Sequence, residues 1–352
     1  MSNNKTNIIK AELSKWPRAE LAQLPTPLHT MKNFEKLFDG QELWIKRDDL
    51  TGLAGGGNKT RKLEFLVGDA IDQGADMLVT AGAIQSNHTR QTASAAAKCG
   101  LKCALLHFGW TKDTGPTYRK VGNILLSSMM GADLYIDETV RPIEDQSPLE
   151  DFVKLQKKNG HTPYLIPAGA SEHEFGSFGY FGCAAEIVDQ SNKLGIHFDY
   201  IVHCTGSSST QAGLVAGFKV MGENTRVIGI ADDEETSIKK QRVLQLANDT
   251  LIKMGLPERV DSDDIEIIAG GLSPYGVTDD DTFAAMKLFS QAEGLIADPV
   301  YEGKAIRGLL DLAKAGRFEK GSRIMLMHLG GTTAVHAYAS QYDAIELTKL
   351  TD

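Results

Sequence analysis

The sequence has few cysteines and no long apolar run. Its 352 residues include four cysteines, and no two of them have the CxxC spacing of a redox or metal site. We therefore interpret Cys99, Cys103, Cys183 and Cys204 as buried reduced thiols, and we expect no metal centre. No run of about 18 apolar residues occurs, and the first residues lack a basic segment followed by an apolar one. We expect a cytoplasmic protein without membrane contact.

Positive charge is also scarce. Lys and Arg number 37 against 46 Asp and Glu, which gives a formal net charge of -9. Nucleic-acid affinity depends on clustered Lys and Arg that displace counterions from phosphates, so we expect no nucleic-acid partner. The 42% hydrophobic content is typical of a globular chain. Because 352 residues exceed the usual size of one core, we expect two subdomains around a cleft.

Short apolar runs alternate with longer helical patterns, which is typical of βαβ units in a parallel sheet. One series begins with the strand-like LWIKRD at 43–48 and continues to about residue 136. A second series begins near Phe175. The pattern predicts an α/β fold of two three-layer αβα subdomains with mostly parallel, twisted sheets.

A glycine-rich segment joins the first of these strands to the helix that follows it. Gly55, Gly56 and Gly57 precede Asn58 and Lys59, and glycines let the backbone approach a flat ligand closely. Most lysines are simply solvated, so Lys59 alone is weak evidence of a site. The adjacent glycines favour a functional interpretation.

A second junction between a strand and a helix is Gln85-Ser86-Asn87-His88. Free N–H groups at a helix start, together with a hydroxyl, would suit a substrate carboxylate. A helix cap at Ser86 or Asn87 is the commoner reason for such residues, and both interpretations stay open. We interpret His88 as a hydrogen-bonded helix residue rather than a catalyst.

The third junction, at residues 204–210, reads CTGSSST and carries several hydroxyls. Four hydroxyls and successive N–H groups at a helix start predict a phosphate-binding cup, with a helix cap as the alternative. The junction has neither the lysine of a P-loop nor a GxGxxG motif, so a nucleoside polyphosphate is not expected.

Two later segments are weaker signals when each is taken alone. Tyr301-Glu302-Gly303 follows Asp298-Pro299 at a turn into a helix, where a glutamate is often only a partner of the helix dipole. His328-Leu329-Gly330-Gly331 follows the strand-like RIMLM, and ligands of α/β sheets bind at such strand ends.

Together these segments resemble the pyridoxal-phosphate-dependent family that contains aminocyclopropane-carboxylate deaminase and D-cysteine desulfhydrase. That family has the tryptophan synthase β-like fold, also called fold type II. The resemblance runs nearly from end to end and rests on LPTPLH, WIKRDD, GGNKTRKLEFL, GAIQSNHTRQTA, VGN with MGAD, IPAGASEH, FDYIVHCTGSSSTQAG, DPVYEGKA and HLGG.

The resemblance implies a cofactor, pyridoxal 5'-phosphate, and a role for each matching residue. Lys59 would hold the cofactor as a Schiff base, Asn87 would bond to its ring oxygen, and Glu302 would face its pyridine nitrogen. The cofactor would also contact Leu329, and its phosphate would be held by Ser207, Ser208, Ser209 and Thr210. The residues implied near the substrate are Ser86, Asn87, Tyr275 and Tyr301. Ser86 would bind the carboxylate or move a proton, and either tyrosine would act as acid, base or nucleophile.

The resemblance also implies a domain division and a reaction. Residues 1–58 and 175–352 would form a large cofactor-binding domain, residues 59–174 a small one, with the site between them. The expected reaction opens 1-aminocyclopropane-1-carboxylate to 2-oxobutanoate and ammonia, and the expected assembly is a homodimer. The alternative is D-cysteine desulfhydrase, which yields pyruvate, sulfide and ammonia, or a related β-elimination.

Different segments favour different members of this family. Glu302 and Leu329 favour the deaminase, because desulfhydrases usually have Thr or Ser after the tyrosine and Thr in HTGG. GAIQSNH is more similar to the desulfhydrases, and SSST matches neither member. The substrate is therefore expected to be a small amino acid, with its identity left open between the two.

Overall fold

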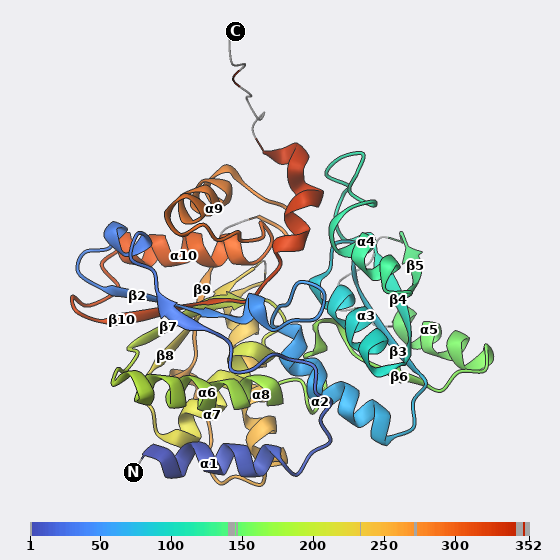
Figure 1. The fold of residues 1–352 in the computed structure, drawn as a ribbon, viewed down its shortest axis with the longest axis horizontal. Coiled ribbons are helices and arrows are strands. Elements are labelled where there is room, and N and C mark those ends of the chain that lie inside the picture. The colour runs from blue at the N-terminus through green and yellow to red at the C-terminus, as the bar shows by residue number, and fades with distance from the viewer. Residues whose placement is uncertain are drawn as a thin grey trace.

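Two lobes of α/β structure lie side by side in the computed structural model, which describes residues 2–139, 145, 147–232, 234–270, 273–342 and 348 (Figure 1). The larger lobe has a six-stranded sheet in the order β1-β2-β10-β7-β8-β9, and the smaller has a four-stranded sheet in the order β5-β4-β3-β6. Only the β1–β2 pair is antiparallel among the paired strands described. The predicted α/β class with mostly parallel sheets is confirmed.

Helices cover both faces of the larger sheet. Its strands are β1 (Leu28–Thr30), β2 (Glu42–Arg47), β7 (Tyr200–Thr205), β8 (Arg226–Ala231), β9 (Glu266–Ala269) and β10 (Arg323–His328). One face carries α1 (Ser2–Leu13), α6 (Phe178–Leu194), α7 (Ser209–Met221) and α8 (Thr236–Lys253), and the other carries α9 (Asp280–Glu293) and α10 (Glu302–Lys314) (Figure 1). Successive residues of β7 point to opposite faces, so Ile201 and Val202 enter two separate apolar clusters. Every residue of β7 is consequently buried.

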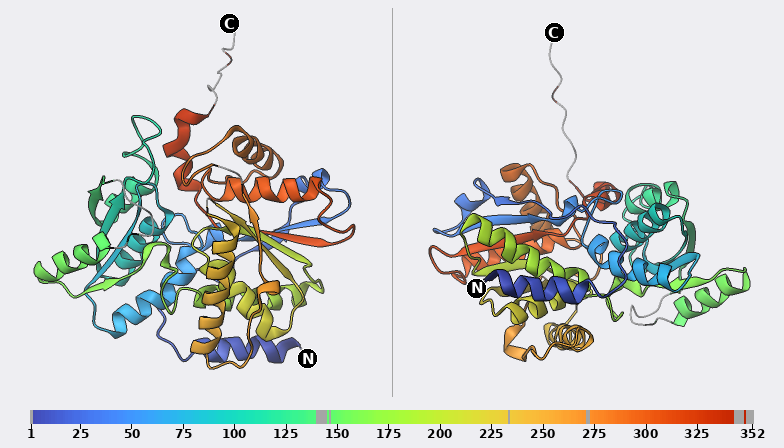
Figure 2. Two further views of the ribbon diagram at one scale, coloured as in Figure 1. Left: turned by 180° about the vertical axis from the view of Figure 1, so that it is seen from behind. Right: turned by 60° about the horizontal axis from the view of Figure 1, so that its bottom comes forward.

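The smaller lobe repeats this plan at reduced size. Its strands are β3 (Met77–Ala83), β4 (Lys102–Phe108), β5 (Asp133–Asp137) and β6 (Pro163–Leu165), and its helices are α3 (Asn87–Cys99), α4 (Gly122–Met129) and α5 (Ser147–Lys158). Elsewhere along the chain, 3-10 segments occur at Phe34–Leu37, Asp48–Leu50, Ala168–Ala170, Ser262–Asp264 and Thr332–Gln341. The two lobes are also distinct from each other in two further views of the molecule (Figure 2). Helix α2 (Lys59–Asp72) contacts both α3 and α6, so it joins the lobes.

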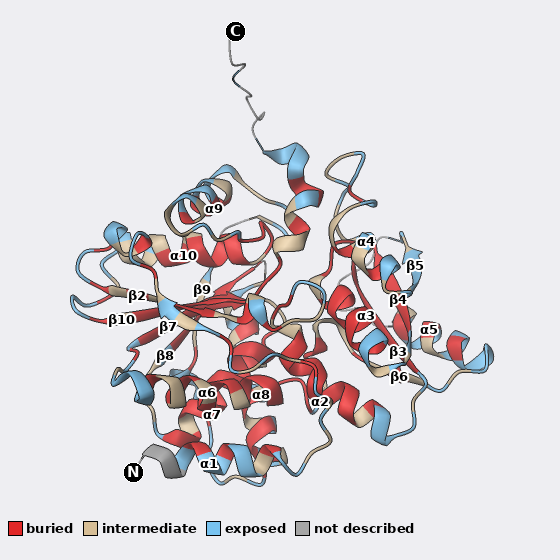
Figure 3. Cartoon of the chain, in the orientation of Figure 1, coloured by how far each residue is buried: buried red, intermediate tan, exposed pale blue. Residues whose placement is uncertain are grey.

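Burial follows the sheets closely (Figure 3). The central strands β3 and β7 are buried along their whole length, whereas the edge strand β5 is largely exposed. Cys103, Cys183 and Cys204 are buried free thiols, as expected. The expectation is wrong for Cys99, which is only partly buried because it lies in the last turn of α3. Among the described residues, no helix combines the length and the apolar character needed to cross a membrane.

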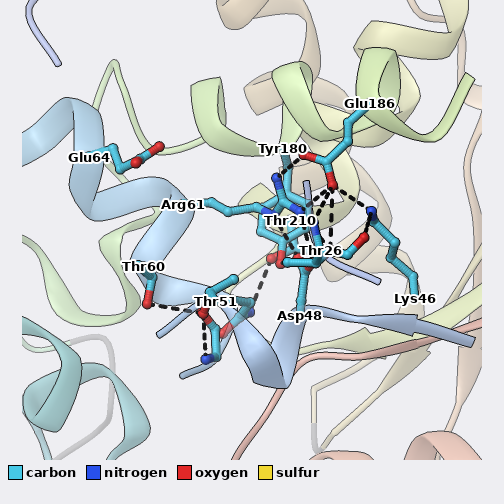
Figure 4. A network of polar contacts seen from close by, with 12 residues as sticks. Thr26, Lys46, Asp48, Thr51, Thr60, Arg61, Glu64, Tyr180, Glu186 and Thr210 are labelled. Carbon is cyan, nitrogen blue, oxygen red and sulfur yellow. Dashed lines mark hydrogen bonds and ion pairs between the residues drawn. The ribbon is translucent and has the colours of Figure 1, made fainter. Parts of the chain in front are cut away.

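A buried ion-pair network ties α2 to the larger sheet (Figure 4). Arg61 Nε lies 2.8 Å from Asp48 Oδ2, and Arg61 Nη2 lies 2.9 Å from Glu186 Oε1. Lys46 also contacts Glu186, and the Tyr180 hydroxyl donates to Asp48 Oδ2 at 2.6 Å. Burial alone would raise the pKa of Asp48, but Arg61 and Lys46 lower it below its ordinary value. The two carboxylates and the Arg61 guanidinium therefore remain charged inside the protein.

We predict that Asp48→Asn destabilises the protein by about 3 to 5 kcal/mol, because it leaves part of the buried Arg61 charge unpaired. The measurement is the free energy of unfolding in urea. Asp151→Asn serves as the matched control, since Asp151 pairs with Lys154 on the exposed surface of α5 and its removal should barely move the unfolding midpoint. Equal midpoints for the two variants would contradict the importance of the network.

Candidate active site

A cavity of about 400 Å³ lies where strands from both lobes end. Its lining includes Ala81, Gly82 and Ala83 at the end of β3, and Cys204 and Thr205 at the end of β7. The cavity brings together all the predicted site residues except one: Lys59, Ser86, Asn87, Ser207, Ser208, Thr210, Tyr275, Tyr301, Glu302 and Leu329. The residue that does not line it is Ser209. Ligands commonly bind at the carboxyl ends of parallel strands, and the cavity has this position.

A strained loop places Lys59 at the first position of α2. Residues 53–57 all have positive φ, a region that costs free energy for residues other than glycine. Gly56 is required there, because a Cβ atom on it would lie 1.9 Å from the carbonyl oxygen of Asp49. The glycines of the predicted motif thus allow the chain to turn sharply from the 3-10 segment Asp48–Leu50 into α2.

The amine of Lys59 is directed into the cavity. Lys59 Nζ lies 3.2 Å from the carbonyl oxygen of Gly169 and 3.2 Å from Ser207 Oγ. Burial lowers the pKa of Lys59 to about 8, because removal from water disfavours the ammonium form. A substantial neutral fraction therefore exists near pH 8, and the neutral amine is the form that attacks a carbonyl carbon.

The N-terminus of α3 forms one wall of the cavity. Ser86 Oγ accepts hydrogen bonds from the backbone N–H groups of His88 at 3.2 Å and Thr89 at 3.3 Å, so the helix-cap interpretation is confirmed. The same side chain lines the cavity. His88 Nε2 lies 2.8 Å from Thr80 Oγ1, and burial lowers the pKa of this histidine well below its ordinary value. His88 is therefore neutral and hydrogen-bonded, as expected.

The hydroxyls at the N-terminus of α7 do not all converge. Ser207, Ser208 and Thr210 line the cavity, and the buried Ser208 Oγ has no hydrogen-bond partner among the described residues. Ser209 Oγ instead accepts from Lys62 Nζ at 2.6 Å and lies 2.9 Å from Ser171 Oγ. The expected convergence of four hydroxyls is thus wrong for Ser209, whose side chain is turned toward α2 by the first turn of α7.

Two tyrosines that line the cavity form a hydrogen-bonded pair. The hydroxyl oxygens of Tyr275 and Tyr301 are 2.7 Å apart. Burial, together with the neighbouring Tyr275, raises the pKa of Tyr301 well above its ordinary value. The Tyr301 hydroxyl is therefore protonated at neutral pH, and a proton can pass between the two hydroxyl oxygens.

Glu302 is a buried carboxyl group with an unused oxygen. Its Oε1 has no hydrogen-bond partner among the described residues, and its Oε2 lies 3.6 Å from His328 Nδ1. Burial and the nearby Asp298 raise the pKa of Glu302 well above its ordinary value. The backbone N–H of Leu329 opposes this rise, but without a cation beside it the carboxyl is protonated at neutral pH. This carboxyl is suited to a basic ring nitrogen that brings its own positive charge.

Asp298 was not identified as a site residue from the sequence. Its Oδ1 accepts from the backbone N–H groups of Val300 and Tyr301, both at 2.9 Å, so it fixes the turn that presents Tyr301 and Glu302. Burial raises the pKa of Asp298 to about 6, although these N–H groups oppose the rise. An aspartate just before a proline and a helix start is the signal that could have found it.

The donors and acceptors of the cavity fit pyridoxal 5'-phosphate. An aldehyde would find the amine of Lys59, a phosphate would find the hydroxyls before α7, and a ring nitrogen would find Glu302. A Cβ atom at Gly331 would lie 2.3 Å from Asp298 Oδ2 and 2.9 Å from Asn87 Nδ2, so a glycine is required where the backbone packs against these two side chains.

Comparisons with known proteins agree with this chemistry. The model of the pyridoxal-phosphate dependent enzyme family matches residues 19–330. The chain is 42% identical over 332 residues to a 1-aminocyclopropane-1-carboxylate deaminase of Burkholderia vietnamiensis, covering 93% of this chain and 98% of the relative. It is 43% identical over 329 residues to the protein of the same name from Methylobacterium nodulans, again covering 93% and 98%.

Solved structures give the same result for the fold. A crystal structure of an ACC deaminase homologue superimposes with a TM-score of 0.85 at 35% identity, covering 95% of this chain and 97% of the homologue. O-ureido-L-serine synthase, at 16% identity and a TM-score of 0.65 over 92% of both chains, shares the fold alone. A family model that spans most of the chain, together with relatives of this identity, is decisive. This chain belongs to the family of pyridoxal-phosphate-dependent enzymes.

Proposed function

We propose that this enzyme opens 1-aminocyclopropane-1-carboxylate to 2-oxobutanoate and ammonia. The observation that carries the proposal is the Tyr275–Tyr301 pair, which lines the same cavity as Lys59 and Glu302. This substrate has no α-proton, so ring opening needs a further nucleophile, acid or base beside the lysine, and the tyrosines supply one. Relatives named for this activity, 42% and 43% identical along nearly the whole chain, support it.

The proposed division into domains follows the two sheets. We place residues 1–58 and 175–352 in the large domain and residues 59–174 in the small one. In support, the strands of the six-stranded sheet lie within residues 28–47 and 200–328, and those of the four-stranded sheet within 77–165. Helix α2 starts the small domain and packs against both α3 and α6. The proposed substrate site lies between the domains.

Pyridoxal 5'-phosphate, when bound, withdraws electrons from the α-carbon of an amino acid. In our proposal Lys59 holds it covalently, Asn87 donates to its ring oxygen, and Leu329 packs beside it. Its phosphate is held by the hydroxyls of Ser207, Ser208 and Thr210, while Ser209 supports that loop through its bond to Lys62. Glu302 holds a proton between its carboxylate and the ring nitrogen, which strengthens the electron withdrawal that ring opening requires.

The remaining residues act on the substrate. The positive end of the α3 dipole and the Ser86 hydroxyl attract its carboxylate. The neutral amine of Lys59 accepts or returns protons near the α-carbon, consistent with its pKa of about 8. Tyr301, hydrogen-bonded to Tyr275, acts as acid, base or nucleophile at the ring carbon whose bond to the α-carbon breaks. Asn87 contributes to both cofactor and substrate binding.

The proposed reaction is tested by assaying the wild-type enzyme with 1-aminocyclopropane-1-carboxylate and D-cysteine side by side. We expect 2-oxobutanoate and ammonia from the first substrate with the higher kcat/KM. The measured products are ammonia, 2-oxobutanoate, pyruvate and sulfide. A higher kcat/KM for D-cysteine, with sulfide and pyruvate as products, would replace the proposal by the desulfhydrase alternative.

We predict that Glu302→Thr combined with Leu329→Thr lowers the ratio of kcat/KM for the cyclopropane substrate over D-cysteine at least tenfold, or ~1.4 kcal/mol. The loss of the carboxylate weakens electron withdrawal, which ring opening needs more than α-proton removal does. Glu172→Thr is the matched control, because Glu172 is an exposed carboxylate on the same cavity. Its ratio should equal that of the wild type. An unchanged ratio in the double variant would remove Glu302 from this role.

A further inference from the structure

Arg90 is a buried cation whose partners are all neutral. It is fully buried in α3, and among the described residues no carboxylate forms an ion pair with it. Its Nη1 donates to the carbonyl oxygen of Ala54 at 2.6 Å, and its Nη2 donates to that of Gly56 at 2.9 Å. Burial lowers its pKa to about 10, so it stays protonated at neutral pH. One guanidinium thus holds the strained loop that precedes Lys59.

The Nε–H group of Arg90 fixes the orientation of the side-chain amide of Asn123. Arg90 Nε donates to Asn123 Oδ1 at 2.7 Å, and Thr333 Oγ1 donates to the same oxygen at 2.6 Å. A guanidinium can only donate, so the amide oxygen of Asn123 has to face it. The amide nitrogen of Asn123 consequently points the other way, where it donates to the carbonyl oxygen of Gln85 at 2.8 Å.

The same amide nitrogen fixes the orientation of Asn87. Asn123 Nδ2 donates to Asn87 Oδ1 at 2.8 Å, so the oxygen of Asn87 is used and its Nδ2 is turned away from Asn123. Within the described part of the chain, Asn87 Nδ2 has no hydrogen-bond acceptor, and the residue lines the cavity. Every donor in this series meets an acceptor as far as Asn87, whose NH2 group is left for a ligand in the cavity.

We propose that Arg90 and Asn123 are positioning residues that orient the Asn87 amide with its N–H donor toward the ring oxygen of the cofactor. The same guanidinium couples this orientation to the loop that places Lys59. The hydrogen bonds from Arg90 to Asn123 and from Asn123 to Asn87 thus form a relay. When this relay is broken, the Asn87 amide is free to turn and present its carbonyl oxygen to an anionic ring oxygen, which repels it. This inference rests on the proposed placement of the cofactor at Asn87.

Asn123→Asp tests the relay with almost no change of shape. The carboxylate still accepts from Arg90 but has no N–H to donate to Asn87 Oδ1. We expect cofactor affinity, measured by equilibrium dialysis, to fall about five- to tenfold. We also expect the visible absorption band of the bound cofactor to shift. A purely structural role would instead lower the thermal midpoint of the cofactor-free protein and leave affinity and band unchanged in the folded protein.

Thr333→Val is the matched control, because it removes a donor to the same Asn123 oxygen while Arg90 still fixes the amide. Its cofactor affinity and absorption band should equal those of the wild type. Asn123→Ala, which adds no charge, serves as the second relay variant if the aspartate variant does not fold. It should change affinity and absorption in the same direction.

Asn87→Ala separates failure of the relay from failure of the proposed site. If this variant binds the cofactor like the wild type, the proposed placement of the cofactor is wrong. If Asn87→Ala weakens binding while the folded Asn123 variants do not, the relay is overturned and the placement stands. In the Asn87→Ala background, Asn123→Asp should add no further loss of affinity, because the amide it orients is gone.

Discussion

The buried pairing of Arg61 with Asp48 and Glu186 fixes where helix α2 begins, and the active site depends on that point. Lys59 lies two residues before Arg61, so the network that anchors the helix also positions the amine. On the other side of Lys59, Arg90 holds the loop at residues 53–57 in a conformation that is unfavourable by itself. Lys59 is therefore held from two sides by buried guanidiniums: that of Arg61 in α2 itself, and that of Arg90, which extends from α3 to the loop before Lys59.

Burial drives the cavity groups toward their neutral forms. The pKa of Lys59 is lowered to about 8, that of Asp298 is raised to about 6, and that of Glu302 is raised well above its ordinary value. A cofactor brings its own phosphate and ring nitrogen to this desolvated site, where each of these finds an unused hydroxyl or carboxyl. The same desolvation keeps a fraction of the lysine amine neutral and therefore reactive.

The sequence was sufficient to predict the α/β class and the gathering of separate strand-end segments in one cavity, since parallel strands end at a common edge. Side-chain directions were not predictable in the same way. Ser209 faces Lys62 rather than the cavity, because its direction depends on the rotation of α7 against α2. Arg90 in an Ala-rich helix gave no sign of burial, because its acceptors are backbone carbonyls of a distant loop. Such contacts arise only from tertiary packing.

The central claim is that Lys59 holds the cofactor, and the neighbouring Lys62 makes a stringent comparison. Lys62 is also buried, and burial together with the adjacent Lys59 lowers its pKa well below the ordinary value, but its amine donates to Ser209. The direct measurement is borohydride reduction of the cofactor-loaded enzyme, followed by peptide mapping with fragment masses that separate the two lysines. The account predicts the reduced cofactor on Lys59 alone. Label on Lys62 or another lysine, or no bound cofactor at saturating concentration, would contradict it.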